Sequence, residues 1–283
     1  MITSNPFADI SALIPAAVMQ TYVIVMFLLV VGGTILDMMH KKSAKYFFEN
    51  AKKAEKAAKR TVSSGEKTSL AIKTVTNEVL ASSEFANPKR RLSHLLSMYG
   101  FVFFVATTAI MIFGYADASA TTPGIIPLLW HLGALSLCVG GYWFWFSIRV
   151  DVNAEGKKWY EFCRADLFIV SLLMTATFAL IWSFLQSGGI SGMSNLAFVL
   201  FILSSTVLFG GVYFSKFAHM FFKPAAAYQK KITRADGSRE NLPEDYDLTD
   251  PAVQKKFPDI PEYMGDNPPY MGLGIKRESP NHY

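Results

Sequence analysis

Residues 14–38 read IPAAVMQTYVIVMFLLVVGGTILDM, an apolar run whose only charged side chain, Asp37, lies next to its end. A helix of roughly 20 apolar residues crosses the hydrocarbon core of a bilayer, which is about 30 Å thick. An ionised side chain at mid-bilayer is costly, and this run has none there. The run is too long for the apolar part of a secretory signal and no basic residue precedes it. We therefore predict an uncleaved transmembrane helix.

Four further runs of the same kind follow, at 95–115, 125–148, 166–186 and 195–222. The chain is 51% hydrophobic, which a large soluble core could also explain, but here the apolar residues are bunched rather than periodic. Charged side chains stay near the ends of these runs. The sequence predicts an all-α integral membrane bundle of five transmembrane helices.

The 27 Lys and Arg residues set the expected orientation. None precedes the first run and none lies in 116–124 or 187–193, whereas 41–91, 149–164 and the segment from 216 onward hold all of them. Basic segments stay on the cytoplasmic side during insertion. We expect the N-terminus outside and the C-terminus inside, in the inner (cytoplasmic) membrane of a cell. Because this explains the basic residues, no nucleic-acid partner is expected.

Two parts follow from this organisation, a transmembrane domain over 1–226 and a cytoplasmic tail over 227–283. Within the first part, the loop 41–91 is rich in Ala, Lys and Glu up to Arg60, which predicts a helix continuing out of the first span. Its aromatic residues suit a membrane surface, and a solvated charged helix is an equal alternative. The tail is extended and rich in Pro and Tyr, which favours docking on a partner over disorder.

Histidine is the residue type left to hold a metal. Cys138 and Cys163 are the only cysteines and form no CxxC pair, so an iron–sulfur cluster or zinc site of the usual spacing is excluded and both are expected to be packing residues. His131, beside Trp130, is expected in the aromatic belt near the outer face. His282 lies in the tail and is not expected to bear on the membrane.

Three histidines fall near the cytoplasmic boundary. His94 opens the second span and His219 closes the fifth, which gives them the equal depth that two axial ligands of one haem need. His40, at the end of the first span, meets the same condition and is the rival ligand. Lys216, three residues before His219, lies on the same helical face, where it could pair with a haem propionate or simply extend to the headgroups.

Two segments carry a family resemblance. LSHLLSMYGFVFFVATTAI (92–110) and VYFSKFAHMFFKP (212–224), together with the five spans, resemble the cytochrome b family of the respiratory nitrate reductase gamma subunit. They look closer still to the membrane part of the quinone-interacting oxidoreductases of sulfur metabolism. The match covers roughly residues 88 to 226, and the small size and Pro-rich tail look most like the membrane anchors associated with adenylylsulfate reductase.

That resemblance implies a site and a role. His94 and His219 would be the axial ligands of one haem b, with Lys216 beside it. Phe104 and Phe201 stand where the family has the histidines of a second, outer haem, so at most one haem is expected.

The chain would be a non-catalytic electron-transfer subunit that links a cytoplasmic flavin/iron–sulfur enzyme of the adenylylsulfate reductase type to quinone. The quinone is expected near Lys216, Tyr213 and His40. A haem-free anchor for the same enzyme is the alternative, and a small-solute transporter is less supported, because no span has an ionisable residue near mid-bilayer.

Overall fold

The architecture is that of a computed structural model. It describes residues 2–83, 85, 87–117, 119–152, 156–215, 217, 219–239 and 251–256, with six side chains in these ranges outside the description. Those six belong to Lys41, Ser43, Ala44, His219, Phe221 and Gln254. Every described element is a helix, which confirms the all-α prediction for this part of the chain.

Five helices are long and apolar enough to cross a membrane, as expected. They are α2 (Ala16–Lys41), α5 (Pro88–Gly114), α6 (Ile125–Trp143), α7 (Leu167–Ser187) and α8 (Ser191–Gly210). A π-helical turn, η2 (Phe144–Ile148), extends α6, and a 3₁₀ turn, η3 (Arg164–Asp166), precedes α7. These spans indicate a multi-pass membrane protein, whereas its orientation stays a prediction.

The chain divides into two compact units. The first comprises Met1–Ala44 and Pro88–Lys223, and so holds all five spans. The second comprises Lys45–Asn87 and the chain from Pro224 onward. The long loop therefore groups with the start of the tail, whereas the sequence had suggested that it belongs with the spans.

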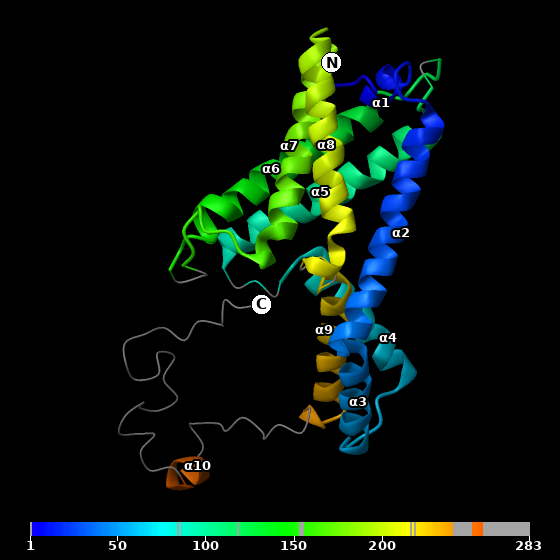
Figure 1. Ribbon diagram of the computed structural model, residues 1–283. Coiled ribbons are helices and arrows are strands. Elements are labelled where there is room, and N and C mark those ends of the chain that lie inside the picture. Colours follow the sequence, from blue (N-terminus) through cyan, green and yellow to red (C-terminus); the bar gives the residue numbers. More distant parts are fainter. Residues whose placement is uncertain are drawn as a thin grey trace. The chain divides into compact units, whose positions relative to one another are not determined.

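Within the first unit, α5 packs on α6 and α7 packs on α8 (Figure 1). The α5–α6 contact is close enough that a Cβ added at Gly100 would lie 2.6 Å from the backbone nitrogen of Leu137. Small residues commonly allow such close approach in membranes. The helix α2 packs against α8, where the Tyr22 hydroxyl lies 3.2 Å from the carbonyl oxygen of Ile202 and 3.0 Å from Thr206 Oγ1.

A short helix that the sequence did not suggest, α1 (Pro6–Ile10), inserts into one end of the first unit. The Asn5 side chain caps it by accepting from Phe7 N–H at 3.0 Å, and its amide donates to the carbonyl of Tyr115 at 2.8 Å. The ring of Phe7 is 2% exposed and lies 5.1 Å, centroid to centroid, from that of Trp182. This segment closes the bundle end that is predicted to face outward.

The fifth span is shorter than predicted. The helix α8 ends at Gly210, a 3₁₀ turn η4 (Val212–Phe214) follows, and α9 (His219–Ala235) begins only after it. The range 195–222 was therefore wrong beyond 210. A Cβ at Gly211 would overlap the carbonyl oxygen of Val207, so a residue without a side chain suits the end of this helix.

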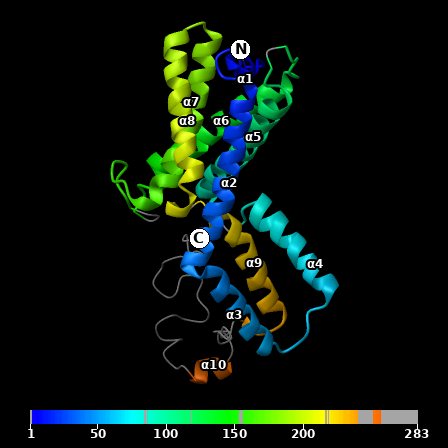
Figure 2. The same cartoon turned by 45° about the vertical axis from the view of Figure 1, so that its right-hand side comes forward.

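The second unit is a helical assembly of α3 (Ser43–Lys56), α4 (Ser64–Lys73), the π-helix η1 (Thr74–Leu80) and the part of α9 from Pro224 (Figure 2). Lys231 pairs with Glu78 at 3.0 Å, and the amides of Lys59 and Arg60 donate to the carbonyl of Asp236 at 2.8 and 3.2 Å. These contacts tie the loop to the segment that follows the spans.

Two details of the predicted loop and tail need correction. The loop is helical as expected, but it does not continue directly from the first span, because Lys42 adopts a left-handed conformation (φ 52°) between α2 and α3. The tail is helical rather than extended as far as Ala235, and again in α10 (Pro251–Lys256). The remainder of the predicted tail, at 240–250 and 257–283, lies outside the described residues.

Candidate functional site

An apolar groove in the first unit is the best candidate for a ligand site. It runs along the second half of α2, is closed on its other side by the end of α8 and by η4, and has a volume of about 780 Å³. Its lining is Leu28, Leu29, Gly32, Gly33, Leu36, Met39, His40, Gly210, Tyr213 and Phe214. Most of these side chains are strongly exposed, including Leu36 at 57% and Met39 at 71%. The groove is therefore open to the surface of a helix that the hydropathy places in lipid.

His40 and Tyr213 give the groove one polar end. Their rings lie 5.8 Å apart, centroid to centroid, in an edge-to-face arrangement. An imidazole and a phenol can each donate a hydrogen bond, and each can accept one. Because the other lining side chains are apolar, the groove can hold a long hydrocarbon ligand whose polar head reaches these two rings.

Local backbone features create this geometry. The end of α8 at Gly210 turns the chain back so that η4 contacts α2. There, a Cβ at Gly33 would lie only 3.0 Å from the Cβ of Val212. At Gly32, next along the helix, an added Cβ would meet nothing within 4 Å. One glycine thus allows the helix and the turn to touch, while the other leaves the groove open.

The proposed haem ligands are only partly described. His94 lies in the first turns of α5 and its side chain is exposed. His219 is the first residue of α9, with its side chain outside the description, and Lys216 lies wholly outside the described residues. The axial pair therefore stays a prediction. His282 is also outside the description, whereas the rival His40 lies in the groove.

Aromatic rings fill the interior near His94. Phe101, seven residues after His94 and hence on the same face of α5, lies 6.3 Å from Phe217 and 6.5 Å from Phe209. Phe217 is 3% exposed and also packs against Phe168 at 5.2 Å. The described residues about two helical turns beyond His94 thus form packed ring contacts.

A second aromatic layer lies where the resemblance would place an outer haem. Phe104 and Phe201 are both 5% exposed, and their ring centroids lie 6.4 Å apart. Phe104 stacks on Trp130 at 5.3 Å and Phe201 on Trp182 at 5.7 Å. Phe104 and Phe201 therefore belong to one packed ring cluster.

His131 is not a residue of an aromatic belt, because it is buried at 5% exposure. Its Nδ1 lies 2.7 Å from the carbonyl oxygen of Pro127, and its Nε2 lies 2.8 Å from the Ser183 hydroxyl. The carbonyl can only accept, so Nδ1 donates to it, while Nε2 forms its hydrogen bond with Ser183. Both nitrogens are satisfied, which gives His131 a role in packing α6 against α7.

The two cysteines also differ from one another. Cys138 is buried, as expected of a packing residue, whereas Cys163 is exposed, so the prediction was wrong for the second. No group of three or more His, Cys, Asp and Glu among the described residues could hold a metal ion.

The sequence analysis named His40 and Tyr213, together with Lys216, as neighbours of a quinone, but it missed the groove that His40 and Tyr213 line. The pair Gly32-Gly33, in a helix otherwise lined by large apolar residues, was the available signal. In comparisons with known proteins, no family description, curated protein or solved structure matches this chain.

Proposed function

We propose that the chain is a membrane anchor that holds a cytoplasmic flavin/iron–sulfur oxidoreductase at the bilayer and provides a quinone with a binding site in the groove. The observation that carries this proposal is the juxtaposition of His40 and Tyr213 at one end of an apolar, surface-open groove. The sulfur-metabolism partner, of the adenylylsulfate reductase type, rests on the resemblance of 92–110 and 212–224.

Both parts of a quinone, its polyisoprenoid tail and its ring, suit this groove. Its polyisoprenoid tail needs an apolar channel open to lipid, which the leucines of α2 supply. Its ring carries two carbonyl oxygens that accept hydrogen bonds, and imidazole N–H and phenol O–H groups are donors. Reduction to quinol takes up two electrons, delivered by the partner enzyme, and two protons, for which the exposed His40 offers a path from the predicted cytoplasmic side.

We propose the haem-free form of this anchor. The support comes from the two aromatic layers, around Phe101 and around Phe104, whose rings already occupy the interior positions beside α5. A haem b on His94 and His219 is the second form, in which the two histidines would hold the iron and Lys216 a propionate. A bound haem would supply one-electron transfer between the partner enzyme and the quinone.

Spectroscopy on the purified full chain distinguishes these forms. We expect no cytochrome b bands in the reduced-minus-oxidised spectrum and a pyridine haemochrome content near zero. One haem per chain would instead establish the second form, and His94→Ala and His219→Ala should then each abolish it, with His40→Ala as the control. Retention of haem in the His94 variant and its loss in the His40 variant would identify His40 as the ligand.

Photo-crosslinking tests the groove itself. An azidoquinone added to the full chain in nanodiscs should label peptides that contain 28–40 or 210–214, and decylquinone should compete. Leu36→Trp fills the groove and should reduce this labelling several-fold. Val25→Trp adds the same side chain to an exposed position of α2 outside the lining and should leave labelling unchanged.

Two outcomes would overturn the quinone site. Labelling of other peptides would place the quinone elsewhere. Equal labelling in the two Trp variants would show that the groove does not hold it, and displacement of the probe by added phospholipid as readily as by decylquinone would identify a lipid chain as the occupant.

A further inference from the structure

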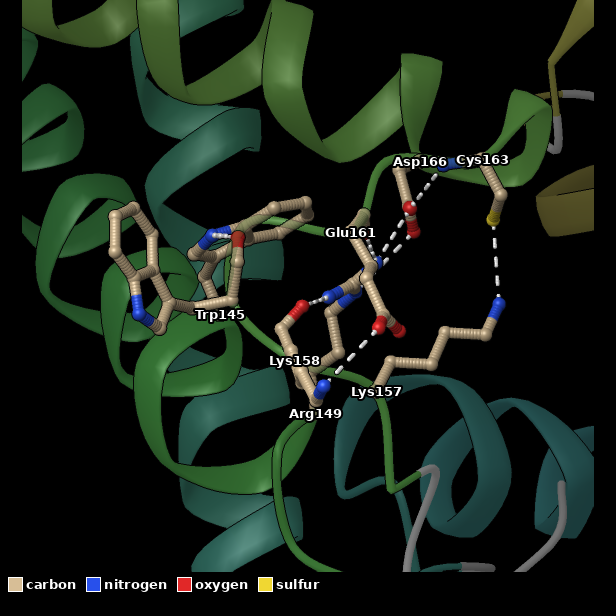
Figure 3. A network of polar contacts seen from close by, with 8 residues as sticks. Trp145, Arg149, Lys157, Lys158, Glu161, Cys163 and Asp166 are labelled. Carbon is tan, nitrogen blue, oxygen red and sulfur yellow. Dashed lines mark hydrogen bonds and ion pairs between the residues drawn. The ribbon is translucent and has the colours of Figure 1, made fainter.

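The connection between η2 and α7 contains a buried ion pair that the sequence analysis did not predict. Arg149 is fully buried, and its Nη2 lies 2.7 Å from Oδ2 of Asp166, the last residue of η3 (Figure 3). The same carboxylate oxygen accepts from the backbone N–H of Cys163 at 2.9 Å. A buried arginine paired in this way joins the end of one predicted span to the start of the next.

Arg149 also holds the backbone of the loop between these spans. Its guanidinium donates to the carbonyl oxygen of Lys158 at 2.8 Å and to that of Glu161. Trp145, whose ring centre lies 4.2 Å from the Arg149 guanidinium carbon, donates from Nε1 to the carbonyl oxygen of Trp159 at 3.1 Å. The segment 156–164 therefore has a fixed backbone, and its outward side chains are presented at set positions.

The outward side of this segment is aromatic and basic. Trp159, Tyr160 and Phe162 are 56%, 54% and 67% exposed. The sequence 156–164, GKKWYEFCR, carries three cations against the single carboxylate of Glu161. That carboxylate lies 4.0 Å from Lys158 Nζ, a surface pair that is largely solvated.

Two of the three cations also have partners within the protein. Lys157 Nζ lies 3.2 Å from Cys163 Sγ, and Arg164 donates from Nε to the carbonyl oxygen of Phe214 at 3.3 Å. The guanidinium carbon of Arg164 also lies 5.6 Å from the ring centre of Phe214. These contacts hold both cations at defined positions in the segment.

We propose that segment 156–164 is a binding site for anionic phospholipid headgroups of the bilayer in which the spans lie. The segment belongs to the connection between two apolar spans and leads into α7, which puts it at the level of the headgroups. Amphipathic Trp and Tyr rings favour that level, and lysine and arginine are attracted to anionic lipid phosphates. Each basic residue near such a surface strengthens binding by about fivefold. This site does not depend on the proposed redox function.

The position of the exposed rings favours lipid over a soluble partner. The exposed rings precede α7 by a few residues, and they lie beside the end of the preceding span, because Phe162 stacks on Trp145 at 5.4 Å and Trp159 lies 6.4 Å from Phe146, centroid to centroid. A fixed backbone loses little conformational freedom when a lipid binds, which favours a preference for particular headgroups over general attraction.

Fluorescence quenching by brominated lipids tests this site on the full chain in phosphatidylcholine nanodiscs. The signal of Trp159 is taken as the difference between the wild type and Trp159→Phe. Dibrominated phosphatidylglycerol and dibrominated phosphatidylcholine are titrated separately. We expect half-maximal quenching at a several-fold lower mole fraction of the anionic lipid.

Lys157→Gln/Lys158→Gln should reduce this preference by about fivefold for each cation that contributes. The matched control is Lys52→Gln/Lys53→Gln, which removes the same charge from α3 and should leave the preference unchanged. Equal quenching by the two lipids in the wild type would overturn the proposal, as would an unchanged preference in the Lys157/Lys158 variant. Absence of quenching by either lipid would place Trp159 in water and would identify the segment as a surface for a soluble partner.

Discussion

Gly100→Ala is a sharp test of the contact between α5 and α6. An added Cβ would lie 2.6 Å from the backbone nitrogen of Leu137 and 2.7 Å from the carbonyl oxygen of Gly133. Neither atom can rotate away, because both belong to the backbone of α6. The helices would have to separate by roughly 1 Å to restore ordinary van der Waals contact.

Two opposing effects set the change in the free energy of unfolding that Gly100→Ala causes. Forcing extra volume into a packed contact costs about 1–3 kcal/mol. Separation also lengthens the hydrogen bond from Ser93 Oγ to the carbonyl oxygen of Gly140, now 2.8 Å, which is worth about 0.6 kcal/mol between membrane helices. Against these losses, replacing glycine by alanine within a helix stabilises the folded state by up to about 1 kcal/mol, because alanine has the higher helix propensity. We expect Gly100→Ala to lower the free energy of unfolding by about 1–2 kcal/mol.

Reversible SDS titration in mixed micelles, followed by circular dichroism, measures this change. The matched control is Gly114→Ala, at the last residue of the same helix, where an added Cβ meets nothing within 4 Å. This variant should be at least as stable as the wild type. If Gly100→Ala proves as stable as Gly114→Ala, then α5 and α6 do not cross at Gly100 and the packing described above is wrong.

Two charged pairs give further predictions. Arg149→Met leaves the carboxylate of Asp166 buried without its cation and should lower the free energy of unfolding by about 3–5 kcal/mol in the same SDS titration. Arg149→Met/Asp166→Asn should recover part of this loss. Full stability of the single variant would contradict the ion pair. In the second unit, hydrogen bonds from Arg60 at 2.6 and 2.9 Å lower the pKa of Glu66. Because the folded-state pKa is lowered, the stabilisation is present above the unfolded value of about 4.3 and is lost as the pH falls through the folded value. Amide exchange over 60–68, corrected for intrinsic rates, should lose protection in that pH range in the wild type, while Glu66→Gln should show no such pH dependence.

Local composition was sufficient to identify the spans but not where they stop. Apolar runs of adequate length predicted all five helices, because lipid requires an apolar surface along each of them. The fifth was extended too far, since 211–222, despite Lys216 and His219, is still rich in aromatic and aliphatic residues. Its end depends on how Gly211 meets the carbonyl of Val207, which composition does not reveal.

The side-chain contacts that the sequence analysis did not predict join residues that lie far apart in the chain. Arg149 and Asp166 were both visible at the ends of spans, but their pairing depends on how the loop folds between them. His131 resembled a belt residue because its partner Ser183 lies 52 residues away in the chain. His40 and Tyr213, which the sequence analysis named with Lys216 as neighbours of a quinone, do lie side by side, with ring centroids 5.8 Å apart, whereas the quinone site itself stays a prediction.

The aromatic layers and the groove together restrict where the proposed quinone can reach this bundle. Phe101 and Phe104 pack into ring clusters beside α5, which occupies the interior at two levels. The groove, by contrast, lies between α2 and α8, on the surface, and requires no helix to move for a ligand to enter. We therefore infer that a hydrophobic electron carrier enters laterally from the lipid and stops where His40 and Tyr213 provide polar contacts. The position of this polar end, close to the chain's connection with its basic segments, would put the carrier within reach of an enzyme docked on the predicted cytoplasmic side.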